Sequence, residues 1–263
     1  MSEGGRSGSD ERRQAASGVD RSFRVVRLAT VDSTNRAALD AAHAGEPEGL
    51  VVVADHQSAG RGRLGRTWEA APGSSLLLSV LLRPGRAVGE LHLCTAAAAL
   101  AMADAVHDVA GFAPDLKWPN DLLADGRKLA GVLAEADLGS SGAVRAVVVG
   151  IGINVGAAAI PPDLASTATA CDVVAGRAVD RRGLLDAFLV HLGPRLDTPD
   201  PELVADYRAR LATIGARVRV ERAAGSVEGI AVDVDDLGAL VLEADSGETL
   251  TVSAGDVVHL RPA

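Results

Sequence analysis

Four short segments contain nearly all residues of the types that are scarce in this chain. Of its 26 lysines and arginines, only Lys117 and Lys128 are lysines, and both lie in the stretch KWPNDLLADGRK. Lysine carries a compact point charge, whereas arginine carries a planar fork of N–H donors. In a chain whose basic residues are nearly all arginines, lysine is expected at positions where a compact charge matters. This stretch is therefore a candidate site for anions.

The other scarce residue types follow the same distribution. Outside the first 21 residues, the asparagines, tryptophans and glutamine are Asn35, Asn120, Asn154, Trp68, Trp118 and Gln57. They lie in or beside the segments DSTNR (32–36), HQSAGRGRLGRTW (56–68), KWPND…GRK (117–128) and GIGIN (150–154). Chance placement or core packing explains any one of these positions equally well. Together they favour a single site assembled from all four segments.

The Gly/Arg loop, residues 58–67, interleaves Arg61, Arg63 and Arg66 with glycines directly after an expected strand. Glycines let the backbone approach a ligand and expose its N–H groups, and guanidinium groups match planar oxyanions. Trp68, which follows, offers an aromatic face for a ring or a cation. The pattern GxxxxGK[ST] is absent, so the loop predicts a cover over a polyanion such as a nucleoside triphosphate rather than a P-loop. The alternative is a solvated flexible loop.

Lys128 follows an expected hairpin turn at Asp125-Gly126 and lies on a strand face of small apolar residues. Such a lysine either guards a sheet edge or directs its ammonium group into a pocket. Arginine would protect a sheet edge equally well, so the presence of lysine favours the interpretation that the side chain points into a pocket. Before the hairpin, Pro119 ends a strand and presents Asn120 and Asp121 on a turn. Asp121 serves either as a metal or substrate ligand or as a turn former.

Composition narrows the class of protein. Hydrophobic residues make up 48% and aromatic residues 2%, so the core is expected to be aliphatic. The net charge of -9 argues against non-specific binding to nucleic acid or anionic membranes but leaves room for a local basic pocket. Cys94 and Cys171 fit no metal or disulfide spacing and predict buried thiols in a reducing compartment. No secretion signal is evident, and no window approaches ~18 apolar residues. These features predict a soluble cytoplasmic protein.

Hydrophobic patterning predicts the elements that position the four segments. Strands are expected at 23–29, 50–55, 75–84, 116–122, 128–135 and 143–155, and helices at 35–43, 90–110, 164–175, 182–192 and 201–211. The strand at 75–84 is continuously apolar and is expected to be buried on both faces. From residue 216, five short strands predict a small antiparallel barrel. We therefore expect a disordered tail at 1–21, a main domain at 22–212 and a small β domain at 213–263.

The motifs GRGRLGRTW, KWPND, GRKLAGVL and GIGIN, in this order, resemble those of the biotin protein ligases, and the resemblance covers about residues 23–260. It implies an α+β fold with a mixed-sheet catalytic domain, like that of biotin/lipoate ligases and class II aminoacyl-tRNA synthetases, and a C-terminal SH3-like β-barrel. It also implies that biotin and ATP, with Mg²⁺ expected, give biotinyl-AMP and pyrophosphate. A lysine of a biotin carboxyl carrier domain of an acyl-CoA carboxylase would then receive the biotin.

The resemblance assigns roles motif by motif. Biotin would be bound by Ser33, Thr34, Asn35, Gln57, Arg61, Gly62, Arg63, Lys128, Gly131 and Gly150. ATP and the adenylate would be bound by Arg63, Arg66, Trp68, Lys117, Asn120, Asp121 and Asn154. Lys128 and Arg61 would be catalytic, and the metal ligands stay unassigned. Leu64 stands where family members often have another arginine, which removes one charge from the loop.

The chemistry implied by the resemblance agrees with these residue types. A carboxylate and a triphosphate must be brought together, so fixed cations and positioning are the required devices. The acyl-adenylate is prone to hydrolysis, so the Gly/Arg loop is expected to order when ligand binds and to exclude water.

Two other functions are compatible with parts of the same sequence pattern. A lipoate or octanoate transferase or ligase shares the general fold, although the Gly/Arg loop favours biotin. A nucleic-acid-binding module would use the same loop and the terminal barrel, but the net charge of -9 argues against it. The residues before position 23 leave no room for a helix-turn-helix domain. We therefore expect a monofunctional ligase that binds neither DNA nor membrane and is a monomer or a weak homodimer.

Overall fold

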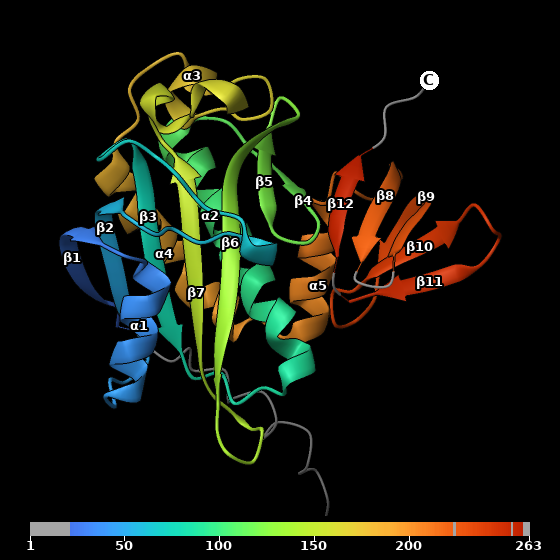
Figure 1. Cartoon of the computed structure of the whole chain (residues 1–263), viewed down its shortest axis with the longest axis horizontal. Helices are drawn as coiled ribbons and strands as arrows, with labels where there is room; N and C mark the ends of the chain where they lie inside the picture. Colours follow the sequence, from blue (N-terminus) through green and yellow to red (C-terminus); the bar gives the residue numbers. More distant parts are fainter. Residues whose placement is uncertain (1–21, 223–224, 254, 260–263) are drawn as a thin grey trace, which may run out of the picture.

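A computed structural model describes residues 22–222, 225–253 and 255–259. The disordered tail expected at residues 1–21 lies outside the described residues. The described chain forms two sheets, one of seven strands with helices on both faces and one of five strands near the C-terminus (Figure 1). The predicted α+β class, with a mixed sheet followed by a small antiparallel β domain, is confirmed.

The larger sheet brings the four motif segments to neighbouring strands. Its order is β1 (Arg24–Val31), β2 (Leu50–Gln57), β3 (Ser75–Leu82), β7 (Val144–Asn154), β6 (Arg127–Leu138), β5 (Asp121–Ala124) and β4 (Asp115–Lys117). The pair β1–β2 is parallel and the other pairs are antiparallel, so the sheet is mixed. Every residue of β3 is buried, as its continuous apolar pattern predicts. The hairpin at Asp125-Gly126 is present, with φ values of 50° and 70°.

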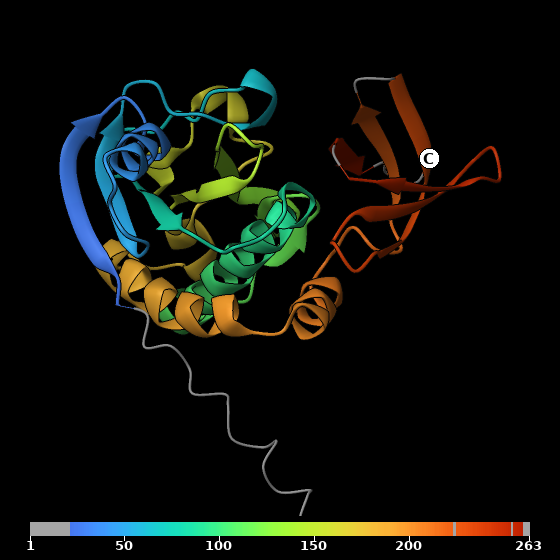
Figure 2. The ribbon, with the colours of Figure 1, turned by 90° about the horizontal axis from the view of Figure 1, so that it is seen from below.

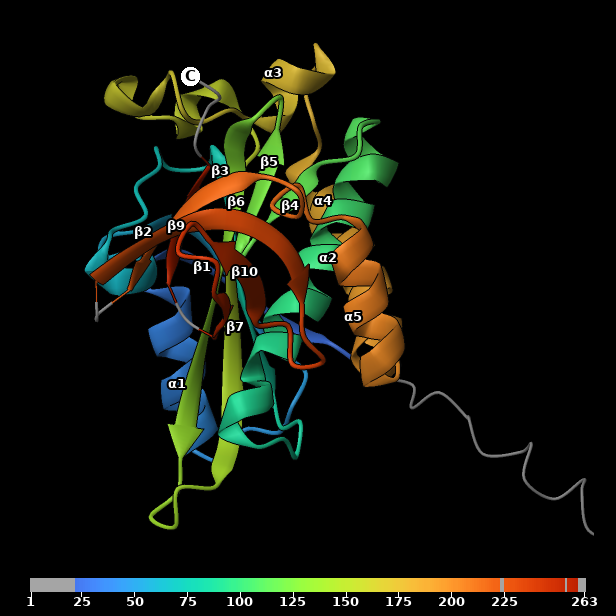
Figure 3. The same ribbon diagram turned by 90° about the vertical axis from the view of Figure 1, so that its right-hand side faces the viewer.

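Helices cover both faces of the larger sheet (Figure 3). On one face α1 (Thr34–His43) packs against β2, β3 and β7. On the other face α2 (Leu91–Ala110) packs against β6 and β7. Beside α2 lie α4 (Arg181–Asp197), which also contacts β3, and α5 (Asp200–Ala209). The main hydrophobic core therefore lies between the sheet and α2.

Helix α2 corrects one expectation. By length and composition alone, Val88–Ala110 is long and apolar enough to cross a membrane, whereas the sequence was expected to contain no such window. The apolar window is 78% buried inside the protein. Its many alanines let α2 approach the sheet and α4 closely, so the high hydropathy reflects burial in the core.

The helix expected at 164–175 is wrong for most of its length. The structure has a 3-10 turn at Pro162–Leu164 and a short helix α3 at Cys171–Ala175. Between them the backbone runs beside the start of β6: Lys128 N donates to Thr167 O and Thr169 N donates to Lys128 O, both at 2.8 Å. Backbone pairing with Lys128 thus replaces the helical hydrogen bonds of this stretch.

The smaller sheet is antiparallel and has the order β11 (Thr249–Val252), β10 (Leu240–Ala244), β9 (Gly225–Val234), β8 (Arg217–Arg222) and β12 (Asp256–His259). It lies beside the larger unit next to α5 (Figure 2). The indole Nε1 of Trp118 donates to Gly238 O at 2.9 Å and joins the two units. The domain boundary expected near residue 212 remains a prediction, in the stretch between α5 and β8.

Candidate active site

One cavity of about 1160 Å³ lies between the larger sheet, the Gly/Arg loop and the end of β12. It exceeds the ~300–1,000 Å³ of ordinary small-molecule sites, so it has room for two ligands. Every site residue expected from the sequence lines it: Ser33, Thr34, Asn35, Gln57, Arg61, Gly62, Arg63, Arg66, Trp68, Lys117, Asn120, Asp121, Lys128, Gly131, Gly150 and Asn154. The structure therefore brings the four segments together, while the roles of the individual residues remain predictions.

The cavity floor, which we define as Gly131, Gly150 and Gly152, is made of glycines on two paired strands. Gly131 of β6 lies opposite Gly152 of β7. A Cβ on Gly150 would lie 2.0 Å from Asn35 Oδ1, and a Cβ on Gly152 would lie 2.6 Å from the Trp68 ring. The spacing of glycines in GIGIN thus clears space on one strand face for two other side chains. Gly152 was not among the expected site residues, although the same motif contains it.

One end of the cavity is neutral and rich in hydrogen bonds. Gln57 Oε1 accepts from Thr34 N at 2.7 Å and lies 3.0 Å from Thr34 Oγ1. Ser79 Oγ lies 2.8 Å from Thr34 Oγ1 and 2.6 Å from Asn35 Oδ1. Ser33, Thr34 and Asn35 are all buried. Ser79 was missed, because only the fold shows that its hydroxyl is fully buried beside Thr34 and Asn35.

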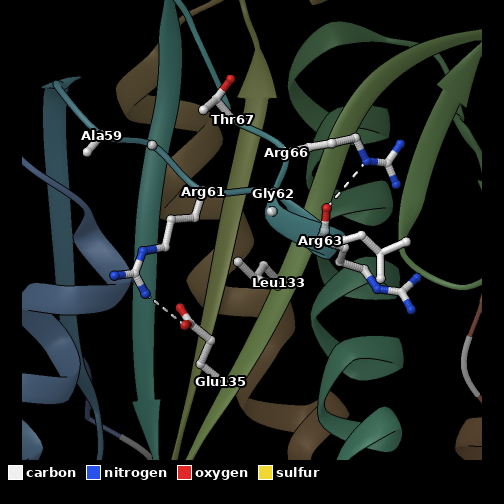
Figure 4. Close-up of a pocket in the computed structure, with 11 residues that line it drawn as sticks. Ala59, Arg61, Gly62, Arg63, Arg66, Thr67, Leu133 and Glu135 are labelled. Atoms are coloured by element: carbon white, nitrogen blue, oxygen red, sulfur yellow. Dashed lines mark hydrogen bonds and ion pairs between the residues drawn. The ribbon is translucent and has the colours of Figure 1, made fainter. Parts of the chain in front are cut away.

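Asn35 connects this end to the Gly/Arg loop. Its Nδ2 donates to Leu133 O at 3.2 Å and to Glu135 Oε2 at 2.7 Å. Glu135 Oε1 in turn accepts from Arg61 at 3.1 Å (Figure 4). Because both N–H donors of Asn35 are engaged by the protein, the structure supports a positioning role for Asn35. Glu135 was missed because a glutamate in this chain is not a scarce residue.

Lys128 lies at the centre of the cavity wall. Its Nζ forms an ion pair with Asp121 Oδ1 at 2.7 Å and lies 5.8 Å from the centroid of the Trp68 ring. Asp121 faces Lys117 across the turn between β4 and β5. Burial lowers the pKa of Lys117, while the negative charge of Asp121 acts in the opposite direction. Asp121 is thus the first residue of β5, directly after the turn, and the counter-ion of a cavity lysine.

The cavity roof, which we define as the Gly/Arg loop together with β12, is held by charged groups. Arg63 donates to Asn120 Oδ1 and to Gly255 O, both at 3.2 Å. Arg66 pairs with Asp256 at 2.6 Å. A Cβ on Gly60 would lie 2.3 Å from Trp68 O, which explains a glycine there, although Gly60 was not among the expected site residues. The loop also borders a second hollow of about 520 Å³ (Figure 4).

The roof combines a strained, exposed turn with positive charge. Leu64 at its tip has φ of 55° and is 72% exposed. A left-handed backbone is unfavourable for leucine, so this turn stores some strain. Burial lowers the pKa of Arg63, although guanidinium groups remain charged. A strained, exposed loop of cations is suited to moving over an anion.

The remaining predicted amides tie backbone segments together. Asn120 Nδ2 donates to Val132 O at 2.7 Å, and Asn154 Nδ2 donates to Thr169 O at 3.0 Å. In the residues that the structure describes, no group of three or more His, Cys, Asp or Glu side chains is placed to hold a metal ion. A divalent cation here would need oxygen ligands from a bound phosphate chain.

Comparison with known proteins decides the family. Residues 28–154 match the Biotin/lipoate A/B protein ligase family, and residues 213–260 match the Biotin protein ligase C terminal domain. The biotin--[acetyl-CoA-carboxylase] ligase of Mycobacterium tuberculosis is 44% identical over 89% of this chain and 88% of the relative. The chain belongs to the biotin protein ligase family.

Other members of the biotin protein ligase family extend this likeness. The bifunctional ligase/repressor BirA of Bacillus subtilis is 35% identical over 82% of this chain, but only 68% of that relative is covered. The structure of the Aquifex aeolicus biotin protein ligase in complex with biotin and ATP has a TM-score of 0.76 and 27% identity. It covers 90% of this chain and 99% of that chain.

Proposed function

We propose that this chain joins biotin to ATP as biotinyl-5'-AMP and transfers the biotin to a lysine of a biotin carboxyl carrier domain of acyl-CoA carboxylases. The observation that carries this proposal is one cavity with two chemically different ends. The neutral end contains Ser33, Thr34 and Gln57, and the other contains Arg63, Arg66, Lys117 and Lys128. The first suits the uncharged ureido ring of biotin, and the second suits phosphates.

The first step joins the two anions. A carboxylate oxygen of biotin attacks the α-phosphorus of ATP, and pyrophosphate leaves. The charge that develops on the α-phosphate oxygens needs a fixed cation, which Lys128 supplies from the cavity wall. Arg61 and Arg63 on the loop cover the same region and restrict access of water.

The second step transfers the acyl group. The neutral amine of a carrier lysine attacks the acyl carbon of the mixed anhydride, the bond to the phosphate oxygen breaks, and AMP leaves with that oxygen. The attacking lysine loses a proton to solvent. Because this step uses no pyrophosphate, it needs only the adenylate-binding part of the cavity.

Nucleotide binding is assigned to the wall formed by Trp68, Asn120 and Asn154, with Trp68 against the adenine ring. Mg²⁺ is expected as the companion of ATP. Asp121 is a suitable carboxylate, and phosphate oxygens and water would complete the six ligands that Mg²⁺ prefers. When bound, the ion would neutralise charge on the pyrophosphate leaving group.

We also propose a monofunctional, cytoplasmic ligase. The M. tuberculosis and Paracoccus denitrificans relatives, both named as ligases, are matched over 88% and 97% of their length. Cys94 and Cys171 are free and buried, which fits a reducing compartment. A gel shift at physiological salt is expected to detect no DNA complex. Sedimentation is expected to show a monomer or a weak homodimer.

The test is incubation of the chain with labelled biotin, ATP and a biotin carrier domain. The proposal predicts that label is attached to the carrier lysine only when ATP is present. When the carrier is omitted, the label is expected as free biotinyl-AMP. Lipoate and octanoate in parallel reactions are expected to give no adenylate. Adenylation of lipoate in preference to biotin would overturn the assignment of substrate.

A further inference from the structure

His259 is the last described residue of β12, an edge strand of the smaller sheet. It lines the same cavity as Lys117, although it comes from the C-terminal sheet and Lys117 comes from the catalytic sheet. None of the four motif segments contains it. A half-buried histidine beside a half-buried lysine is an unusual pairing, because each group makes protonation of the other less favourable.

The imidazole is held in place by Thr213. The backbone N–H of Trp118 donates to Thr213 Oγ1 at 3.0 Å, and Thr213 Oγ1 lies 3.2 Å from His259 Nε2. Thr213 is fully buried. His259 is thus fixed relative to the backbone next to Lys117 through a single hydroxyl group, and it bridges the two sheets at the wall of the cavity.

Thr213 can partner both charge states of the ring. When the imidazole is neutral, the hydroxyl hydrogen can point to Nε2, and Nδ1 then carries the ring hydrogen. When the imidazole is charged, Nε2–H donates to the hydroxyl oxygen, which has a second lone pair for the N–H of Trp118. The hydrogen bond between Thr213 and His259 therefore persists in both charge states, with its direction reversed.

We propose that His259 binds the β- and γ-phosphates of ATP and takes up a proton when the triphosphate binds. The proposal rests on the proposed function, because it places the polyphosphate at the end of the cavity lined by Lys117. The charged imidazole and Lys117 would act as a pair of donors from opposite sheets. The C-terminal domain would then sense whether a triphosphate or a monophosphate occupies the site.

The electrostatic environment fits this role. Burial, and then the positive charge of Lys117, lower the pKa of His259 below its usual value, so the ring is neutral at pH 7 without ligand. Arg217 from β8 and Asp256 from β12 also line the cavity, where Arg217 pairs with Asp245 and Asp256 with Arg66. The several negative charges of a triphosphate would raise the pKa of His259, and a proton would enter near neutral pH.

The decisive experiment compares the unchanged protein with His259→Gln in both half-reactions. We expect the KM for ATP in biotin-dependent pyrophosphate exchange to rise about tenfold, as for loss of one hydrogen bond to a charged group. The KM for biotin is expected to stay unchanged. Transfer from purified biotinyl-AMP to the carrier domain is also expected to stay unchanged, since biotinyl-AMP lacks the β- and γ-phosphates. His191→Gln, on the surface of α4, is the matched control.

Calorimetry supplies a readout independent of turnover. Binding of α,β-methylene ATP at pH 7, measured in buffers of different ionisation enthalpy, is expected to show proton uptake by the unchanged protein. His259→Gln is expected to abolish the uptake, and His259→Lys is expected to restore affinity without it. Equal ATP affinity and equal uptake in His259→Gln would overturn the proposal, as would an equal loss in the transfer step. If the unchanged protein exchanges no pyrophosphate with biotin, the proposed function itself fails.

Discussion

The floor and the roof of the cavity are built by opposite means. The floor consists of Gly131, Gly150 and Gly152 on paired central strands, where Asn35 lies against Gly150, and Trp68 lies against Gly152 and Gly131. The roof consists of the Gly/Arg loop and β12, where Arg61 and Arg66 form ion pairs and Arg66 is 57% exposed in its pair with Asp256. Buried, fully bonded groups hold one geometry, whereas exposed ion pairs contribute about 0–1 kcal/mol each and exchange readily.

This difference separates two tasks within one site. A rigid floor can recognise the shape and hydrogen bonds of an uncharged ring, because its own groups cannot rearrange. A weakly held cationic roof can open for substrates and close over their negative charges. Substitutions in the floor should therefore weaken the binding of biotin, and substitutions in the roof should change how readily the roof closes over the substrates. Lys128, between the two, should affect the chemical step.

The largest effect is expected for Lys128→Arg. The planar guanidinium cannot take the place of the compact ammonium between Asp121 and Trp68, so adenylation is expected to fall about a hundredfold or more. Stopped-flow or radiometric measurement of pyrophosphate release checks this. Arg127→Lys, one position earlier on the same strand, is the control and should retain its rate. An unchanged rate in Lys128→Arg would remove Lys128 from the mechanism.

The contact between the catalytic domain and the turn before β10 has a pH signature, because a Cβ on Gly238 would lie 2.4 Å from the His92 ring. His92 of α2 is partly buried between Trp118 and Tyr207, and burial lowers its pKa to about 4. The unfolded chain binds this proton from about pH 6.5 downward, so the free energy of unfolding should fall between pH 6.5 and 4, by roughly 3 kcal/mol in total. Urea denaturation across this range measures the loss.

His92→Leu, which cannot titrate, is the comparison for that measurement. Its stability is expected to lack this component of the pH dependence, whereas His191→Gln should retain it. Parallel curves for the unchanged protein and His92→Leu would show that the contact between the domains does not depend on a neutral His92.

Gly150→Ala tests the floor. The added methyl group would overlap Asn35 Oδ1 and force Asn35 away from Ser79 and Glu135, at a cost of about 1–3 kcal/mol. We expect the KM for biotin to rise about tenfold and the KM for ATP to change little. Gly139→Ala, where the nearest atom would be 3.4 Å away, is the matched control. A rise in the KM for ATP alone would contradict the division of tasks.

The smallest effect is expected for Asp256→Asn in the roof. Loss of its pair with Arg66 should speed trypsin cleavage at the loop arginines a few-fold at low salt and hardly at all at high salt. Asp245→Asn, which breaks a pair with Arg217 elsewhere in the same sheet, should leave cleavage unchanged. Equal cleavage in both variants would mean that the smaller sheet does not hold the loop.

The sequence predicted the convergence of the four segments well, because scarce residue types mark positions where geometry matters. It could not predict Ser79 or Glu135. Both are common residue types, and their importance depends on partners that only the folded sheet brings near. The helix expected at 164–175 failed for a similar reason: pairing of Thr167 and Thr169 with Lys128 overrides local preference. His259 gave no local signal, since Lys117, the charged group beside it, comes from the other domain.

The central claim is that one cavity holds a carboxylic acid against ATP until they react. Isotopic exchange between pyrophosphate and ATP, measured with and without biotin and in the absence of any carrier, tests this claim most directly. We predict exchange that requires biotin and is nearly abolished in Lys128→Arg. Exchange at the same rate without biotin, or no exchange from the intact protein, would contradict it.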